Sequence, residues 1–319
     1  MSATVVTVAI PVLNGGGQLL GTLAAVRNQS LEAEVELLVA DSGSTDGSRE
    51  AAVGHGARVI DVPSGEFGHG RTRNLLLREA RGAHVALLTQ DSEPTGGDWL
   101  ARLLEGFGLA PDVALVYGPY LPRPGASAAV RREIERWFSS LTPGVERLAV
   151  GERELAAVEL MGRRGFFSDA NACILRSAWE RVPFRDIAYA EDRALALDML
   201  RAGYAKVYEP RAAVLHSHEY RADERFRRAF DEWRGLREVY GWREPAGPGR
   251  LLSQLRGELG SLRREGAGVR TLALAAANEL ARFAGAVLGS RAVSLPAPLQ
   301  RRLSLEGRAT RSAGLAGDR

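Results

Sequence analysis

The stretch TVVTVAIPVLNGGG, residues 4–17, sets the fold class of this chain. Its apolar run through Ile10 has the composition of a buried strand, and the glycines after it lead into a segment with helical spacing. The stretch VELLVADSGSTDG, residues 35–47, repeats the order of strand, polar turn and helix. Such alternation predicts a parallel sheet whose strands are joined by right-handed crossovers.

The same alternation continues to about residue 121, and a less regular pattern follows it. We expect further strands at 58–62, 85–89 and 114–117, and helices at 17–27, 47–53, 71–81 and 98–107. Beyond residue 121, we expect helices at 130–138 and 192–202, and strands at 172–175 and 205–208.

The chain beyond residue 225 has mostly helical spacing. An apolar helix is expected at 272–288, but it contains Glu279 and Arg282, and two charges in this length argue against a membrane-spanning helix. We therefore expect a first domain over residues 1–240 and a helical extension over residues 241–319 with a frayed tail.

The composition is that of a soluble globular protein. The 319 residues are 45% hydrophobic and 25% charged, which excludes disorder as the main state. The single cysteine, Cys173, excludes an internal disulfide and a cysteine-based zinc site, which indicates a reducing compartment. The N-terminal residues show no signal-peptide pattern, so a cytoplasmic location is expected.

Charge is distributed unevenly along the chain. From Arg221 to the end there are 19 Arg and 11 acidic residues, a net charge of +8, whereas the preceding residues carry −5. After Trp242 this region has no aromatic side chain except Phe283, which argues against single-stranded nucleic acid as a partner. Two interpretations of its helices stay open: a helical cap or homodimer interface, and peripheral attachment to the anionic inner leaflet of a membrane.

Candidate binding residues follow the first two strands, because loops after parallel strands meet at one edge of the sheet. Pro11 and Asn14 follow the first strand, and Asp41 and Ser42 follow the second. Ser44 and Asp46 in this turn are expected to serve as a turn and cap, whereas Asp41, at the strand end before the cap, can accept hydrogen bonds from a base or ribose. Neither a dinucleotide-binding glycine motif nor a P-loop is present.

Candidate metal ligands come from two distant segments. Gln90, Asp91 and Glu93 follow the strand at 85–89, and carboxylates two residues apart can approach one Mg²⁺ ion that also binds a diphosphate. A solvated turn is the alternative. His216 and His218 follow an apolar run and point the same way on an extended segment, where they can reach a metal or a phosphate.

Two more segments place charge at the start of expected helices. The segment GHGRTRN, residues 68–74, places glycine backbone amides near Arg71 and Arg73 at the start of a helix, which favours an anion-binding site. The alternative is that the arginines lie on a solvated helix face. Glu191 and Asp192 precede the helix at 192–202. Carboxylates there either cap the helix or act as a general base toward a hydroxyl.

Eight segments in this order resemble family 2 glycosyltransferases of the GT-A fold, in particular bacterial rhamnosyltransferases. The resemblance covers about residues 5–240 and implies a Rossmann-like mixed sheet flanked by helices, with residues 1–121 binding the nucleotide and residues 122–240 the acceptor. The segments are PVLNGG, ADSGSTDGS, FGHGRTRN, LLTQDSEP, VYGPYLPRP, FFSDAN, AEDRALALDMLRAGY and VLHSHEY.

This resemblance implies an inverting glycosyltransferase that uses Mg²⁺ or Mn²⁺. The implied donor is dTDP-L-rhamnose or another deoxysugar nucleotide, and the acceptor is a hydroxyl of a lipid-linked or cell-surface glycan. Asp192 would be the catalytic base, and Glu191 would position it or bind the acceptor. Asp91 would be the metal ligand, with His216 or His218 completing the site and Glu93 as a further candidate.

The resemblance also assigns residues to the donor. Those near the nucleotide would be Pro11, Asn14, Asp41, Ser42 and Gln90, and those near the diphosphate Arg71, Arg73 and Asn74. Two positions depart from the family pattern, because Thr89 occupies the first position of the DxD motif and Asp169 stands where Asn is expected. A nucleotidyltransferase acting on sugar phosphates and a non-catalytic sugar-nucleotide-binding protein are the alternatives.

Overall fold

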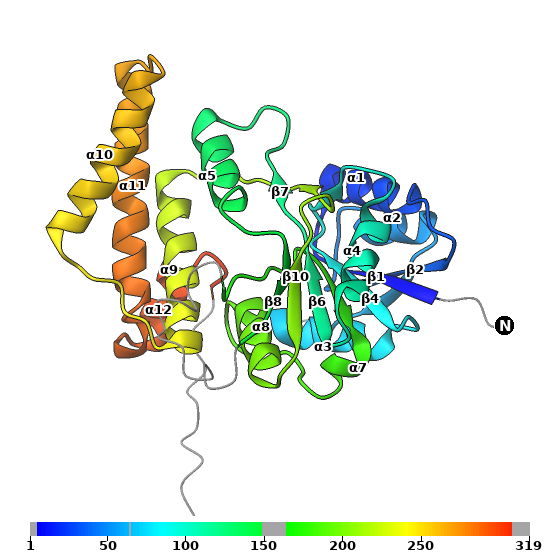
Figure 1. Cartoon of the computed structure of the whole chain (residues 1–319). Helices are drawn as coiled ribbons and strands as arrows, with labels where there is room; N and C mark the ends of the chain where they lie inside the picture. Colours follow the sequence, from blue (N-terminus) through cyan, green and yellow to red (C-terminus); the bar gives the residue numbers. More distant parts are fainter. Residues whose placement is uncertain (1–4, 64, 149–163, 308–319) are drawn as a thin grey trace, which may run out of the picture. The chain divides into compact units, whose positions relative to one another are not determined.

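The computed structural model describes residues 5–63, 65–148 and 164–307 (Figure 1). Contacts between residues divide the chain into two units. The first consists of Met1–Asp186 and Glu191–His218, and the second of Ile187–Ala190 and Glu219–Arg319. The contacts thus group residues 219–240 with the C-terminal helices, whereas the sequence-based boundary lies at residue 240. The division into domains at residue 240 stays a prediction.

A mixed sheet forms the centre of the first unit (Figure 1). Among the described residues it contains β1 (Val5–Val12), β2 (Glu34–Asp41), β3 (Arg58–Asp61), β4 (His84–Leu88), β6 (Val113–Tyr117), β8 (Gly144–Glu146), β9 (Asn171–Leu175) and β10 (Ala205–Tyr208). Their order is β3-β2-β1-β4-β9-β6-β10-β8. β9 is antiparallel to both of its neighbours and β8 to β10, whereas the remaining pairs are parallel.

Helices cover both faces of the sheet. They are α1 (Gly16–Arg27), α2 (Ser48–Gly54), α3 (His69–Glu79), α4 (Trp99–Glu105), α5 (Ala128–Phe138), α7 (Arg176–Trp179) and α8 (Glu191–Arg201). Leu76 of α3 and Leu195 of α8 belong to one hydrophobic cluster, and Leu23 of α1 and Trp99 of α4 to the other. Strands buried on both faces explain why the sequence shows nearly continuous apolar runs.

Several helix boundaries differ from the sequence-based prediction by one to three residues. The helix expected at 98–107 ends at Glu105 and continues as a 3₁₀ turn, Gly106–Leu109, where two glycines weaken the α-helix. The helix expected at 71–81 already begins at His69. Gly70 in its first turn lies so close to the backbone carbonyl of Arg185 that a Cβ there would collide with it.

A small second sheet in the first unit was not predicted. It consists of β5 (Glu93–Pro94), β11 (Val214–Leu215) and β7 (Tyr120–Leu121), in which β11 pairs with both of the others. Each strand is two residues long, so no periodicity marks it in the sequence. The buried Asn171 amide supports this region by donating to the Pro119 and Ala212 carbonyls at 3.1 and 2.8 Å.

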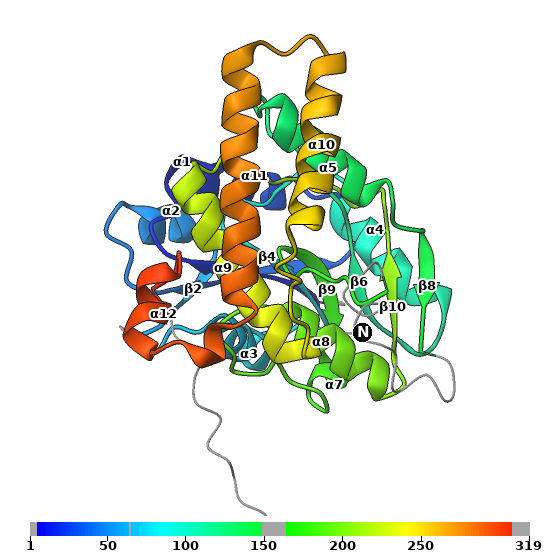
Figure 2. The same ribbon diagram turned by 90° about the vertical axis from the view of Figure 1, so that its left-hand side faces the viewer.

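The second unit is helical. It contains α9 (Ala222–Tyr240), α10 (Pro248–Arg264), α11 (Val269–Gly289) and α12 (Ala297–Leu303). Figure 2 shows α10 and α11 side by side as a hairpin. Gly285 and Gly289 of α11 allow close approach to α9, because a Cβ at either position would collide with the Phe226 or Phe230 carbonyl.

Helix α11 is long and apolar enough to cross a membrane by length and composition alone. Only 17% of an 18-residue stretch of this helix is buried in the described structure. Two of its three charged residues, Glu279 and Arg282, form an ion pair with each other at 2.6 Å, and the third, Arg270, lies in its first turn. A buried core helix of a soluble protein passes the same composition test, so the finding is weak evidence for a membrane span.

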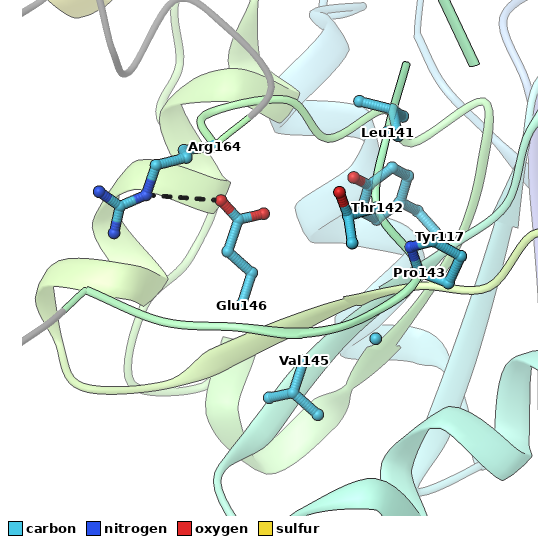
Figure 3. A pocket seen from close by; sticks show the side chains of 8 residues that line it. Tyr117, Leu141, Thr142, Pro143, Val145, Glu146 and Arg164 are labelled. Atoms are coloured by element: carbon cyan, nitrogen blue, oxygen red, sulfur yellow. Dashed lines mark ion pairs between the residues drawn. The ribbon is translucent and has the colours of Figure 1, made fainter. Parts of the chain in front are cut away.

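A cavity of about 330 Å³ lies beside β8 in the first unit (Figure 3). Glu146 in its wall pairs with Arg164 at 3.7 Å and with the fully buried Lys206 at 2.6 Å. None of the residues with an expected role in donor or metal binding lines it. The lining residues are Tyr117, Leu141, Thr142, Pro143, Gly144, Val145, Glu146 and Arg164.

Candidate active site

The loops after β1 and β2 interlock at the edge of the sheet. Asn14, with a left-handed φ of 50°, accepts a hydrogen bond from the Thr45 amide at 2.9 Å, and its own amide donates to Ser44 Oγ at 2.9 Å. The buried Asp41 carboxylate accepts the Ser44 amide at 3.1 Å. Asn14 and Asp41 therefore shape these loops, and their contacts with a nucleotide stay predictions.

The other residues predicted near the nucleotide lie in the same part of the sheet. Pro11 is within β1, and Ser42 directly follows β2. Ser42 Oγ is buried and has no hydrogen-bond partner among the described residues. Gln90 connects the end of β4 to the first loop, because its side chain accepts from the Leu13 amide at 2.8 Å and donates to the Leu13 carbonyl at 3.2 Å.

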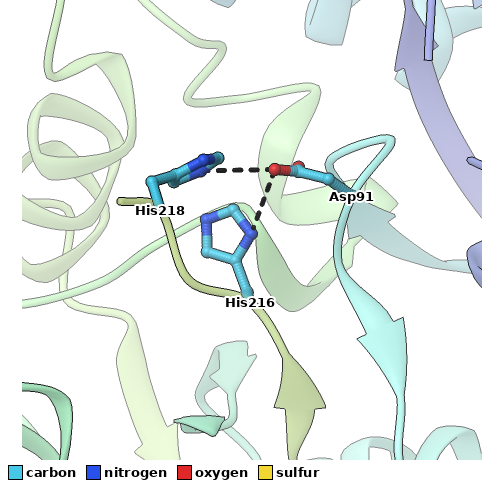
Figure 4. A group of neighbouring side chains, drawn as sticks. All are labelled: Asp91, His216 and His218. Atoms are coloured by element: carbon cyan, nitrogen blue, oxygen red, sulfur yellow. Dashed lines mark ion pairs between the residues drawn. The ribbon is translucent and has the colours of Figure 1, made fainter. Parts of the chain in front are cut away.

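Asp91, His216 and His218 form a compact cluster suited to a cation (Figure 4). His216 Nδ1 lies 3.5 Å and His218 Nε2 lies 3.2 Å from Asp91 Oδ2. Ligand atoms of the three residues all lie within 4.8 Å of one another. One carboxylate oxygen with two imidazole nitrogens fits a transition metal such as Mn²⁺.

The Asp91 carboxyl is electrostatically adapted to positive charge. Burial acts to raise its pKa, but His216, His218 and a hydrogen bond with Thr89 outweigh that effect and hold the pKa below its usual value. Thr89 thus supports Asp91 from the position where the DxD motif has its first Asp. The carboxylate is therefore charged, as a metal ligand must be.

Glu93 lies outside this cluster. Its carboxylate pairs with Arg123 at 3.4 Å, and Arg123 also donates to the backbone carbonyl of Asp91 at 2.6 Å. The Arg123 amide donates to Ser217 Oγ at 3.0 Å, between the two histidines. Arg123 was not among the predicted site residues, although it lies in the segment VYGPYLPRP. Arg123 thus contacts both ligand-bearing segments, the Asp91 segment through its side chain and the histidine segment through its backbone amide.

Tyr120, also missed from the sequence, links the Asp91 cluster to Asp192. Its ring packs edge-on against His216 with centroids 4.8 Å apart, and its hydroxyl donates to Ser168 Oγ. Burial raises the pKa of Tyr120, and the nearby charges of Asp192 and Asp169 add to the rise. One side chain therefore contacts the candidate metal site and lies within electrostatic reach of the candidate base.

Asp192 lies in the first turn of α8, where its Oδ1 accepts the Arg193 amide at 2.6 Å. The preceding Ala190 has a φ of 65°, a strained conformation for a residue with a Cβ. Burial and then the adjacent Glu191 carboxylate raise the pKa of Asp192 to about 6. A carboxyl with this pKa is suited to general-base catalysis near neutral pH.

The side chains predicted to bind the diphosphate all contact other residues of the protein. Arg73 is buried and paired with Glu191 at 3.1 Å. The Asn74 side chain accepts from Trp179 Nε1 at 2.8 Å and donates to the Phe184 carbonyl at 2.9 Å. Arg71 is more accessible and pairs with Asp186 at 3.3 Å. Their contact with a diphosphate stays a prediction.

The architecture of the first unit is that of a GT-A-type glycosyltransferase. The fold is similar to that of the mannosyltransferase PcManGT from Pyrobaculum calidifontis, solved with GDP-Man and Mn²⁺, at a TM-score of 0.56, 20% identity and coverage of 91% of this chain and 86% of that one. Glucosyl-3-phosphoglycerate synthase from Mycobacterium tuberculosis, solved with Mn²⁺, UDP-Glc and phosphoglyceric acid, gives a TM-score of 0.53 at 21% identity, with coverage of 76% and 81%.

The family follows from the sequence comparison. Residues 7–182 match the model of Glycosyl transferase family 2. The chain is 32% identical over 234 residues to the O-antigen chain rhamnosyltransferase RfbN of Salmonella typhimurium, covering 71% of this chain and 70% of the relative. WbaN of Salmonella anatum, another O-antigen chain rhamnosyltransferase, is 29% identical over 70% of each chain. The chain belongs to glycosyltransferase family 2, which confirms the family and fold predicted from its sequence.

Proposed function

We propose that this glycosyltransferase moves L-rhamnose, or another deoxysugar, from a dTDP-linked donor to a hydroxyl of a lipid-linked or cell-surface glycan, with inversion. The names of the two Salmonella relatives support the sugar and the acceptor class. The observation that carries the mechanism is that Tyr120 packs against His216 of the Asp91 cluster and also lies within electrostatic reach of Asp192.

The Asp91 cluster would hold the divalent cation. Its donor set, one carboxylate and two imidazoles, suits Mn²⁺ better than Mg²⁺, which prefers oxygen ligands. When bound, the ion would neutralise charge on the donor diphosphate. Asp91, His216 and His218 would orient it, and Arg123 would hold the Asp91 backbone in place.

Asp192 would act on the acceptor. Its carboxylate takes the proton of the acceptor hydroxyl, and the hydroxyl oxygen bonds to the anomeric carbon of the sugar. The bond from that carbon to the diphosphate oxygen breaks, and nucleoside diphosphate leaves. Attack on the face opposite the leaving group inverts the anomeric configuration, so the step depends on positioning and charge stabilisation.

A donor screen tests this function. Purified protein would be incubated with dTDP-L-rhamnose, UDP-glucose and GDP-mannose, each with Mn²⁺, with Mg²⁺ or with EDTA, and nucleoside diphosphate release measured. We expect release from dTDP-L-rhamnose that EDTA abolishes and Mn²⁺ restores. Pyrophosphate release from sugar phosphate and nucleoside triphosphate would instead establish a nucleotidyltransferase. Binding of sugar nucleotides without turnover on any acceptor would establish a non-catalytic protein.

The second unit would attach the protein to the cytoplasmic face of an anionic membrane. The α10–α11 hairpin exposes apolar side chains, Leu252, Val269, Leu274 and Leu280 among them. Arginines flank these positions, including Arg256, Arg263 and Arg270. Apolar side chains beside basic ones are the combination by which interfacial helices bind acidic lipid.

Vesicle sedimentation tests this attachment. We expect the protein to sediment with phosphatidylglycerol-containing vesicles, and less so at high salt or with purely zwitterionic vesicles. Leu274→Asp should weaken sedimentation, whereas Val53→Asp should not, because Val53 in the first unit is as exposed, at 57% against 58%. Unchanged sedimentation of Leu274→Asp with a loss of dimer mass in light scattering would assign the hairpin to a homodimer instead.

A further inference from the structure

A buried ion-pair cluster adjoins the start of α8. Arg73 of α3 lies between two carboxylates, because its Nε contacts Asp169 Oδ2 and its Nη1 lies 3.1 Å from Glu191 Oε1. The three side chains are no more than 8% exposed. Arg73 Nη1 also donates to the His69 carbonyl at 3.2 Å, which ties the guanidinium to its own helix.

The cluster contains more acidic than basic groups. Asp169, Glu191 and Asp192 bring three carboxyl groups to one buried guanidinium, and burial raises the pKa of Asp169 well above its usual value. His69 Nδ1 lies 4.0 Å from Glu191 Oε1. The titratable and charged groups that face Asp192 are Glu191 and Arg193 on α8, Arg73 on α3, Asp169 before β9, and Tyr120 on β7.

From this geometry we infer that Arg73 is a positioning residue for Asp192: it anchors Glu191 and supplies the positive charge that balances the Glu191–Asp192 pair. The inference rests on the proposed role of Asp192 as the base. It assigns Arg73 to the acceptor side of the reaction, whereas the sequence pattern placed it at the donor diphosphate.

The anchoring follows from chain geometry. Glu191 and Asp192 are consecutive residues in the first turn of α8, so an ion pair that fixes one carboxylate limits the orientation of the other. The backbone immediately before them is strained at Ala190, with its φ of 65°. Strained backbone persists only where the surrounding structure holds it, and the Arg73 ion pair fixes the residue directly after it, Glu191.

The balancing of charge has a definite sign. Burial raises the pKa of Asp192, Glu191 raises it further, and Arg193 and Arg73 act in the opposite direction. Removing the Arg73 charge must therefore raise the pKa of Asp192, and removing the Glu191 charge must lower it. Neutralising Arg73 and neutralising Glu191 should therefore shift the pKa of Asp192 in opposite directions.

If Arg73 instead bound the donor diphosphate, different effects on nucleotide binding and on the titration of Asp192 would be expected. A guanidinium that binds the donor must reach it, but the Arg73 side chain is 4% exposed and occupied by two carboxylates, whereas Arg71 is 37% exposed. If Arg73 contacted the diphosphate, its replacement would weaken nucleotide binding and leave the titration of Asp192 in place.

The experiment compares Arg73→Met, Arg73→Lys and Glu191→Gln with the unmodified protein. The Asp192 carboxyl would be titrated by NMR of ¹³C-labelled aspartate, with its signal assigned from Asp192→Asn, so no turnover is required. Arg78→Met is the matched control, since Arg78 is exposed on the same helix. The pH profile of kcat/KM and the Kd for dTDP would be measured on the same variants.

We expect Arg73→Met to raise the pKa of Asp192 by roughly 0.5 to 1 unit and Glu191→Gln to lower it by a similar amount. Arg73→Lys should keep the pKa near that of the unmodified protein but lower kcat through lost bidentate geometry. Arg78→Met should change neither quantity. The Kd for dTDP should stay within about twofold throughout, because none of these side chains binds the nucleotide in this assignment.

Two results would overturn the inference. One is an unshifted Asp192 titration in Arg73→Met, and the other is a Kd for dTDP at least about tenfold weaker in both Arg73 variants, a loss of roughly 1.4 kcal/mol. If Arg73→Met does not fold, Arg73→Met/Asp169→Asn removes both members of the buried pair, and the pKa of Asp192 in this double variant should lie above that in Asp169→Asn alone. A shifted titration without any glycosyl transfer would uphold the electrostatic coupling and reject only the proposed function.

Discussion

The Asp91 centre and the Asp192 centre contain the same functional group in opposite surroundings. Asp91 lies beside two imidazoles, and its pKa is held below the usual value in spite of partial burial. Asp192 follows another carboxylate, and burial with that neighbour raises its pKa to about 6. The first carboxyl is therefore kept charged, while the second is able to exchange a proton near neutral pH.

These opposite surroundings allow two carboxyl groups of the same unit to serve two chemical tasks. A carboxylate that binds a cation must itself be charged and needs further ligands beside it, and His216 Nδ1 and His218 Nε2 lie 3.5 and 3.2 Å from Asp91 Oδ2. A carboxylate that must take up a proton needs burial and a like charge, which Glu191 provides. The four predictions below test this contrast in order of decreasing effect.

Asp192→Asn should have the largest effect, because an amide cannot accept the acceptor proton. We expect glycosyl transfer to fall by about 10³-fold, within the range for loss of a general base. Binding of dTDP, measured by calorimetry, should change little. Asp198→Asn on the same helix, which removes only an ion pair with Arg185, is the control and should remain active. Full activity of Asp192→Asn would mean that another group is the base.

Asp91→Ala should weaken the metal-dependent part of donor binding. We expect the apparent affinity for Mn²⁺ to fall by at least roughly 10- to 100-fold, the loss typical of residues that merely orient a metal ligand. The measurement is nucleoside diphosphate binding across a Mn²⁺ titration. An unchanged Mn²⁺ dependence would show that the ion binds elsewhere, and the contrast between the two centres would then lose its basis.

The pH dependence should report Asp192 rather than Asp91. Because Asp192 must be deprotonated to act as a base, kcat/KM should fall below about pH 6, by about tenfold per pH unit. Asp91, with its lowered pKa, should stay charged across this range. A profile of kcat/KM from pH 4.5 to 8 with saturating metal would check this. If the fall of kcat/KM at low pH shifted with Mn²⁺ concentration, the titrating group would belong to the metal site instead.

Glu93→Gln should have the smallest effect. Glu93 lies two residues after Asp91, but its carboxylate pairs with Arg123 and is outside the cluster. We expect less than about a threefold change in Mn²⁺ dependence, as for a partly exposed ion pair. A loss comparable to that of Asp91→Ala would place Glu93 among the metal ligands and extend the Asp91 centre beyond its three described members.

Much of the fold followed from local pattern. The strands expected at 58–62, 85–89, 172–175 and 205–208 match β3, β4, β9 and β10 within one residue at each end. These strands could be predicted because burial on both faces of the sheet requires nearly continuous apolar residues. β5, β7 and β11 were not readable, since two-residue strands depend on partners distant in the chain.

The candidate site was predicted in part. The grouping of Asp91 with His216 and His218 agrees with the sequence-based expectation, and their binding of metal stays a prediction. Tyr120 and Arg123 were missed, because a tyrosine and an arginine in a proline-rich turn carry no local mark of function. Arg71 and Arg73 were treated alike, but the structure exposes one and buries the other.

The sequence by itself determined the alternation of strand and helix, the family, and which kinds of side chain follow each strand. Only the tertiary structure decided which of these side chains meet. Arg73 forms ion pairs with Asp169 and Glu191, and Asp91 lies beside two histidines, although these residues are far apart in the sequence. The physical reason is that the pKa and pairing of a charged group depend on its burial and its spatial neighbours, and neither is encoded in the residues next to it.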